Sequence, residues 1–254
     1  MQTENIIRFS PEDANLNSFS QRFPEMNTIW NVEFFPGKNI DLYFKNQVSP
    51  DLSQVFQLLD DGQPIAIDFE WEPDRKKGDA HPIALIQLCS SKICVVLRLE
   101  PHEDSPCLRE FLSTHSFFGK GCGNDRRKIA LTFGKDFHIN LEDISHTQLK
   151  KYKLSNSFNE MIKLFAGQPA AEFKNKKISI SHWSQPINLQ QLLYAGFDAV
   201  GLYECYSNFP GVRQKRNLPP FEEGRYPVIK KRKERKRKIL KEKHPKENAM
   251  SSNS

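Results

Sequence analysis

The sequence lacks several features that mark particular classes of protein. Its five cysteines are odd in number and form no Cys-x-x-Cys pair, so the 254 residues predict neither a disulfide framework nor a zinc ribbon. No run of about 18 apolar residues is present, and the first residues form neither a basic nor an apolar stretch. We therefore expect no membrane contact and no secretory signal, and an intracellular protein whose cysteines stay reduced in the core.

The composition is that of a folded domain with extensions. Hydrophobic residues make up 38% and aromatic residues 11% of the chain, which is enough to bury one sizeable core. Residues 1–28 mix Asn, Ser, Glu and Pro without a clear period, so we expect a poorly ordered extension. We expect the folded domain to span residues 29–210, and residues 211–254 to form a basic, disordered tail.

Positive charge is concentrated near the end of the chain. Residues 230–243, from Lys230 to Lys243, hold ten Lys or Arg and two Glu, a net charge of +8, whereas the whole chain carries +6, which leaves −2 on the other 240 residues. Basic runs of this density contact polyanions or are read by nuclear import receptors. We expect both uses and a location in the nucleus, with a merely solvated tail as the alternative.

Residues 64–71 carry the most informative pattern. They read Pro-Ile-Ala-Ile-Asp-Phe-Glu-Trp, and their period of two predicts a strand with Asp68 and Glu70 on one face. Carboxylates roughly 6.5 Å apart on a strand can share a cation, because Mg²⁺ and Mn²⁺ prefer oxygen ligands. A half-buried strand with a solvated polar face is the alternative, since a short Asp-x-Glu also recurs by chance.

The surrounding patterns predict an α/β fold. A turn at Gly123 leads into a helix that Gly134 ends, and we expect Asn124 to cap it and Asp125 to lie in its first turn. The helix dipole alone would also favour an Asp there. Shorter patterns predict, in chain order, strands at 32–35 and 40–44, a helix from 50 to 60, strands at 83–89 and 93–97, a helix at 108–112 and a strand at 117–121.

Two clusters of basic residues lie beside these elements. A loop at residues 72–81, which we call the basic loop, contains Arg75 and Lys76 and could hold a phosphate backbone next to the carboxylates. The second cluster, Arg126 to Lys128, follows Asp125 and either binds phosphate or is simply solvated.

A late helix supplies a second carboxylate position. Asn188 and Gln191 have the spacing of a capping box, which predicts a helix start. Tyr194 and Asp198 follow at i and i+4, so a phenol and a carboxylate share one face. Such a pair is more often an ordinary surface hydrogen bond, so its meaning depends on the other motifs.

Taken together, the motifs resemble those of the DEDDy 3′–5′ exonucleases. The sequence has Asp-Phe-Glu on a strand, an Asp opening a middle helix and Tyr-x-x-x-Asp on a late helix, in that order. Within that group, roughly residues 60–206 resemble the Werner-syndrome-type exonuclease domain, which is related to ribonuclease D. The segments that carry this resemblance are residues 67–71, 84–88, 119–125, 181–184 and 193–195.

The resemblance implies a fold and a set of roles. It implies a ribonuclease H-like fold with a mixed central sheet, three antiparallel strands first, and helices on both faces. It implies that Asp68, Glu70 and Asp198 hold two Mg²⁺ or Mn²⁺ ions, that Asp125 holds the second ion directly or through water, and that Tyr194 orients the attacking water. Substrate contacts are expected from Trp71, Arg75, Lys76 and Trp183.

The expected activity is removal of nucleoside monophosphates from the 3′ end of nucleic acid, with DNA favoured over RNA. One alternative is an RNA 3′-end-processing exonuclease, and another is a non-catalytic nucleic-acid-binding module. A carboxylate-pair hydrolase of sugars or esters is disfavoured because no Ser/His or Cys/His constellation is evident. The chain stops soon after the last motif, so we expect a stand-alone exonuclease without a helicase region; the oligomeric state stays open.

Overall fold

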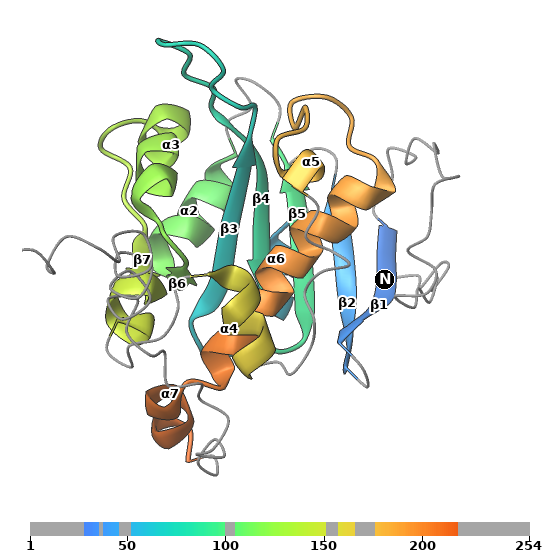
Figure 1. Ribbon diagram of the computed structural model, residues 1–254, viewed down its shortest axis with the longest axis vertical. Helices are drawn as coiled ribbons and strands as arrows, with labels where there is room; N and C mark the ends of the chain where they lie inside the picture. Colours follow the sequence, from blue (N-terminus) through green and yellow to red (C-terminus); the bar gives the residue numbers. More distant parts are fainter. Residues whose placement is uncertain are drawn as a thin grey trace, which may run out of the picture.

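The computed structural model describes residues 28–35, 38–45, 52–99, 105–150, 157–165 and 176–217. They form a seven-stranded mixed sheet with helices packed on both faces (Figure 1). The strands are β1 (Thr28–Phe35), β2 (Lys38–Lys45), β3 (Ile65–Trp71), β4 (Ile83–Cys89), β5 (Ile93–Arg98), β6 (Ser116–Gly119) and β7 (Asn140–Asp143). The helices are α1 (Leu52–Leu59), α2 (Pro106–Thr114), α3 (Gly123–Phe133), η2 (Ser145–Leu149), α4 (Phe158–Phe165), α5 (Lys176–Ser179), α6 (Leu189–Ser207) and α7 (Pro210–Lys215).

The sheet has the order β1-β2-β5-β4-β3-β6-β7. Strands β3, β4 and β5 are antiparallel neighbours, as predicted, whereas β2 joins β5 in parallel, and β6 and β7 continue from β3 in parallel. Asp68 lies directly opposite Gln87 of β4. Because β6 runs parallel to β3, the start of α3 lies at the end of the sheet where β3 finishes.

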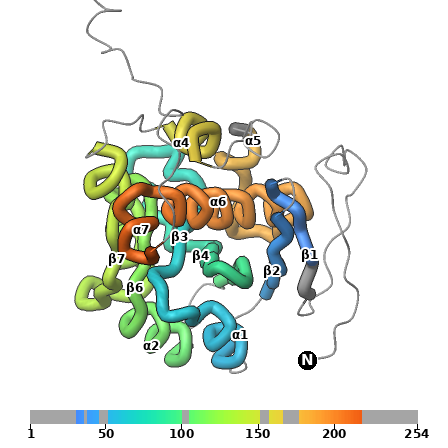
Figure 2. The backbone as a smooth tube through the Cα atoms, turned by 90° about the horizontal axis from the view of Figure 1, so that it is seen from below, coloured from blue at the N-terminus to red at the C-terminus, as the bar shows by residue number. Residues whose placement is uncertain are grey.

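The two faces of the sheet bury different hydrophobic clusters. Ala66 packs into a cluster with α4 and α6, whereas Ile65, Ile67 and Phe69 pack with α1 and α2 on the opposite face. Seen from below, α6 lies across one side of the sheet, and α1 and α2 lie on the other (Figure 2). Since side chains alternate along a strand, Asp68 and Glu70 share the face of Ala66 and point toward α6.

Most of the predicted elements are present, some with shifted ends. Helix α3 ends before Gly134 as expected, but it begins at Gly123, and its N-cap is Cys122, not Asn124. The prediction of Asn124 as the cap was wrong because the helix already begins at Gly123, after a turn that Asp143 of β7 holds, as shown below. The short elements β7, α4, α5 and α7 and the π-helix η2 were not predicted, since four to eight residues carry little periodicity.

The predicted N-terminal extension, residues 1–28, lies outside the described residues except for its last residue, where β1 begins. The predicted tail, residues 211–254, lies outside them from residue 218 on; residues 211–215 belong to α7, so the prediction of a disordered tail was wrong for that part. In the part of the chain that is described, no helix is both long and apolar enough to cross a membrane.

Candidate active site of a nuclease

Three of the predicted carboxylates lie where β3 packs against α6. Asp68 and Glu70 are half-buried on β3, and Asp198 and Tyr194 on α6 are only 4% and 6% exposed. Burial raises the pKa of the Tyr194 phenol, and the nearby charges of Asp198, Glu70 and Asp68 raise it further. One phenol therefore lies within electrostatic reach of three carboxylates and keeps its proton at neutral pH. We call Asp68, Glu70, Asp198 and Tyr194 the β3–α6 site.

Burial of Tyr194 and Asp198 differs from the sequence expectation of a surface pair. Helix α6 packs between the sheet and α4, and nearly every residue from Leu189 to Tyr206 is buried, on all sides of the helix. A buried carboxylate needs a compensating charge or hydrogen bonds, so Asp198 is an unusual choice for a core helix. Its placement beside Tyr194 supports a functional role.

The start of α6 is fixed by a capping box, as predicted. The Asn188 side chain accepts the backbone N–H of Gln191 at 2.9 Å, and the Gln191 side chain accepts the N–H of Asn188 at 3.0 Å. Gln191 also donates to the Ser181 hydroxyl at 2.9 Å. These bonds set the rotation of the helix and therefore the direction of Tyr194, one turn further on.

The ring of Trp183 lies beside the ring of Tyr194. The Trp183 ring is fully buried, lies 6.0 Å from the Tyr194 ring between centroids, and donates its N–H to the Ser179 carbonyl at 3.4 Å. The predicted substrate contact does not fit this position, because a ring with no exposed surface cannot touch a substrate in this conformation. The Trp183 ring belongs to the hydrophobic core.

Asp125 lies in the first turn of α3, as predicted, and is 8% exposed. Burial raises its pKa to about 6, and the neighbouring Asp143 carboxylate adds to this increase, while Arg126 and a hydrogen bond from Cys122 oppose it. The Cys122 thiol also lies within electrostatic reach of Asp68. The charges of Asp125 and of Asp68 therefore both act on the Cys122 thiol.

Asp143, at the end of β7, is a site residue that sequence reasoning missed. Its carboxylate accepts the N–H groups of Gly121, Cys122 and Ser145 at 2.9 to 3.0 Å. Partial burial opposes ionisation, but these hydrogen bonds outweigh it and hold the pKa of Asp143 below its usual range. It therefore fixes the turn that leads into α3 and places a negative charge beside Asp125. No local sequence pattern predicts this role of Asp143, because its partner Gly121 is 22 residues away.

Glu72 connects the end of β3 to the segment before α6. It accepts from the His182 ring at 2.6 Å and from the Ser184 hydroxyl at 3.1 Å. Partial burial works against its ionisation, but these two hydrogen bonds hold its pKa below the usual range. These bonds tie the end of β3, just beyond Glu70, to the segment that leads into α6. No sequence pattern predicts them, because Glu72 and His182 are 110 residues apart.

The predicted substrate residues on β3 and the basic loop are accessible to different degrees. Arg75 and Lys76 are exposed, whereas Trp71 is half-buried. The Lys128 ammonium lies 5.3 Å from the centre of the Trp71 ring.

The donor set at the β3–α6 site suits hard divalent cations. Carboxylate oxygens are the ligands that Mg²⁺ and Mn²⁺ prefer. Burial, and after it the charge of Asp143, raises the pKa of Asp125, so a bound cation would favour the ionised form of this carboxylate. Gln87, opposite Asp68, is fully buried, and neither atom of its amide has a hydrogen-bond partner in the described part of the chain. Across the same residues, no three His, Cys, Asp or Glu side chains lie close enough together to form a ready-made metal site.

Most of the chain is similar in sequence to known proteins. Residues 45–210 match a family profile described as 3′–5′ exonuclease. A mouse protein, the bifunctional 3′–5′ exonuclease/ATP-dependent helicase WRN, is 29% identical over an alignment of 201 residues that covers 74% of this chain and 14% of that protein. The chain therefore spans a small part of the length of this curated relative.

Solved structures share the fold. The Nibbler EXO domain of Aedes aegypti superposes with a TM-score of 0.55 at 17% identity and covers 70% of this chain and 91% of its own. A Trypanosoma brucei RNase D in complex with RNA U12 superposes with a TM-score of 0.52 at 17% identity, covering 66% and 61%. Escherichia coli RNase D gives 0.50 at 18%, covering 71% and 49%. The α/β architecture is that of ribonuclease H-like exonuclease domains, and the chain belongs to the 3′–5′ exonuclease family.

Proposed function

We propose that the β3–α6 site, together with Asp125, removes nucleoside monophosphates from the 3′ end of a nucleic acid strand with the help of two divalent cations. The observation that carries the proposal is that Asp68, Glu70 and Asp198 all lie within electrostatic reach of the protonated phenol of Tyr194. A non-catalytic binding module would gain nothing from this arrangement, because buried carboxylates without cations repel phosphate.

Asp68, Glu70 and Asp198 would hold the cations, with Asp125 contributing to the second ion directly or through water. Mg²⁺ or Mn²⁺ bound there supplies the Lewis acidity that activates water and neutralises charge on the phosphate. We propose that the side chains converge when the cations bind. Two observations support this proposal. The like charges of Asp125 and Asp143 would be neutralised by a bound cation, and the buried amide of Gln87 could bond to a water molecule carried by a cation.

The contributions of the protein itself are orientation and exclusion of water. Tyr194 keeps its proton, so it serves as a hydrogen-bond donor to the attacking water and not as a base. The capping box and Trp183 hold its ring in place. Positioning of this kind supplies a large share of the barrier reduction when there is little covalent chemistry for the protein to perform.

The substrate follows from the similarity and from charge. We propose DNA as the preferred substrate because the motifs resemble the Werner-type exonuclease, to which the mouse relative belongs. RNA is the second candidate, and one observation favours it: an RNase D with the same fold was solved with an RNA oligomer. Both substrates would meet the exposed cations of the basic loop, since phosphate contacts do not depend on sequence.

The basic segment at residues 230–243 adds two further proposals. Its charge of +8 supports contact with the phosphate backbone and recognition by a nuclear import receptor, and therefore action in the nucleus.

Digestion of matched DNA and RNA oligonucleotides tests the proposed function. Substrates of one sequence, labelled at the 5′ or the 3′ end, are incubated with the protein in Mg²⁺, Mn²⁺ or EDTA. We expect 5′-labelled strands to shorten stepwise and 3′-labelled strands to release a labelled mononucleotide at once, with DNA degraded faster than RNA. Shortening from the 5′ end would overturn the proposed polarity, and faster loss of RNA would favour the second candidate.

A further inference from the structure

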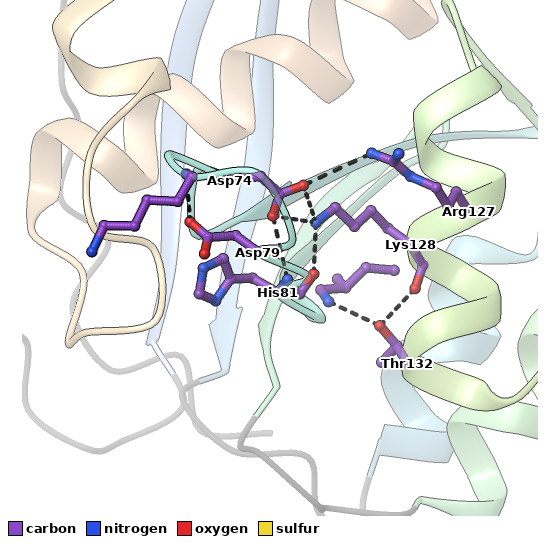
Figure 3. Close-up of polar contacts among 8 residues, drawn as sticks. Asp74, Asp79, His81, Arg127, Lys128 and Thr132 are labelled. Carbon is purple, nitrogen blue, oxygen red and sulfur yellow. Dashed lines mark hydrogen bonds and ion pairs between the residues drawn. The ribbon is translucent and has the colours of Figure 1, made fainter.

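Lys128 on α3 occupies an unusual position for a lysine. It is 1% exposed, less than any other charged residue in the described ranges. Burial of an ammonium group is unfavourable unless its hydrogen bonds are all made. All three N–H groups of Lys128 find acceptors, and all the acceptors belong to the basic loop: Asp74 Oδ1 at 2.9 Å, Asp74 Oδ2 at 3.0 Å and the His81 carbonyl at 2.8 Å (Figure 3).

These acceptors close the basic loop around the ammonium group. Asp74 lies near the start of the loop and His81 at its end, and the His81 N–H also donates to Asp74 at 3.3 Å. Between them, a turn is held by Asp79, which accepts the N–H of Lys76 at 2.7 Å and donates its own N–H to the Lys76 carbonyl at 3.1 Å. The turn needs Gly78, whose φ of +101° is disfavoured for other residues. Lys128 therefore fastens both ends of an internally bonded loop to α3.

A second attachment holds the loop to the other side of the site. Glu72, its first residue, is bonded to His182 and Ser184 before α6. In the alternating series Asp68, Glu70, Glu72, Asp74, the first two carboxylates belong to the β3–α6 site and the next two anchor the loop. Arg75, Lys76 and Lys77 lie between Asp74 and His81, the two residues bonded to Lys128, and are exposed. They come shortly after β3, the strand that carries Asp68 and Glu70.

We propose that Lys128 is a positioning residue that holds Trp71 and the basic loop in place to grip the phosphate backbone of the substrate strand beside Asp68 and Glu70. The inference rests on the proposed exonuclease function. Cations on a fixed loop bind phosphate without the entropy loss of ordering the loop on binding. The Lys128 ammonium, 5.3 Å from the centre of the Trp71 ring, fixes the residue next to Glu70 in the same way.

Lys128→Met tests the proposal, because Met fills much of the space and leaves Asp74 with access to solvent, at 25% side-chain exposure. The matched control is Lys163→Met, which removes one positive charge from α4, where Lys163 is 57% exposed and paired with Glu160. The double variant Lys128→Met with Asp74→Asn removes both charges and is the second test should the single variant fold poorly.

Two readouts separate positioning from mere stability. Trypsin cleaves after Arg75, Lys76 and Lys77, and we expect Lys128→Met to be cut there at least about tenfold faster while its thermal midpoint stays close to that of Lys163→Met. In nuclease assays we expect the KM for an oligonucleotide to rise about tenfold and kcat to stay within about twofold. Lys163→Met should match the wild type in both.

A wild-type rate of cleavage in the basic loop of Lys128→Met would overturn the proposal, and so would a loss of kcat at unchanged KM. Binding of a labelled oligonucleotide in EDTA, which needs no hydrolysis, should weaken in Lys128→Met relative to Lys163→Met. If the wild-type protein degrades no nucleic acid, the exonuclease proposal fails on its own, while proteolysis and binding still decide the role of Lys128.

Discussion

A substitution of Tyr194 distinguishes most clearly between an effect on substrate binding and an effect on the chemical step. Its hydroxyl is kept protonated by burial and by three carboxylates, and its ring packs on Trp183. Removal of the hydroxyl alone leaves that packing and every carboxylate in place. Asp198, one helical turn away, is instead a charged group that a cation would contact.

We therefore expect Tyr194→Phe to lower kcat by roughly 10²- to 10⁴-fold, the usual worth of a positioned catalytic group, while substrate and metal affinities change little. Asp198→Asn should lower metal affinity together with the rate. Single-turnover kinetics and a Mn²⁺ titration of both variants measure the difference. A kcat of Tyr194→Phe within about twofold of the wild type would assign the phenol to packing alone.

At the scale of elements, the start of α3 concentrates negative charge. Asp143 of β7 satisfies the N–H groups of the turn before the helix, and Asp125 lies in the first helical turn behind it. The sequence predicted Asp125 in this turn but not Asp143, because Asp143 reaches the turn through the pairing of β7 with β6 and lies 22 residues from its partner Gly121. The prediction of an Asn124 cap was wrong because the helix begins one residue earlier, after the turn that Asp143 holds.

This arrangement predicts a stability cost for ionised Asp125 in the metal-free protein. Its pKa is about 6 in the folded state, against an ordinary value of 3.8. Between these values the folded state binds more protons than the unfolded state, so the free energy of unfolding falls as pH rises from about 4 to about 6 and stays low above that. Asp125→Asn avoids this loss and should stabilise the protein by roughly 1–3 kcal/mol at pH 7.5 and much less at pH 4.5.

Urea unfolding in EDTA at the two pH values measures the effect. Asp136→Asn, a change at an exposed position in the turn after α3, is the matched control and should alter stability little at either pH. Equal stability of Asp125→Asn and the wild type at pH 7.5 would mean that Asp125 ionises without strain in the folded protein.

At the scale of the molecule, the charge is divided between two regions. Residues 230–243 carry +8, and the rest of the chain carries −2. Removal of residues 230–254 should weaken nucleic-acid binding and reduce nuclear accumulation but leave turnover at saturating substrate nearly unchanged. The log of affinity should fall with log salt at a slope near −0.9 per duplex phosphate neutralised, and truncation should flatten it. Equal slopes for full-length and truncated protein would remove the tail from the binding surface.

Much of the fold was predictable because its strands have strong local patterns. The neighbouring positions of β3, β4 and β5 follow from three consecutive apolar runs, of which the last two are joined by a short turn, and the capping box fixed the start of α6. The burial of α6 on nearly all sides was not predictable from its period, because β1 and β2 extend the sheet and α4 covers the helix. The same burial explains why Trp183 supports the site and does not contact substrate.

The elements that carry the candidate carboxylates were predictable, and the contacts around these elements were not. The strand of Asp68 and Glu70 and the helix of Asp198 follow from local spacing, whereas the contacts of these elements with their neighbours join residues far apart in sequence. Examples are the pair of Glu72 with His182 and that of Asp74 with Lys128, which are 110 and 54 residues apart. Lys128 had been read as a phosphate contact or a solvated charge, and the structure shows that it is neither.

The most direct measurement of the central claim is the length of a 5′-labelled oligonucleotide over time with the wild type and with Asp68→Ala. The wild type should shorten the strand from its 3′ end in Mg²⁺, stop when EDTA is added and resume when Mg²⁺ is restored. Asp68→Ala should leave the strand intact at every time point while its circular dichroism spectrum and thermal midpoint stay close to those of the wild type. Shortening by Asp68→Ala at the wild-type rate, or by the wild type in excess EDTA, would contradict the account.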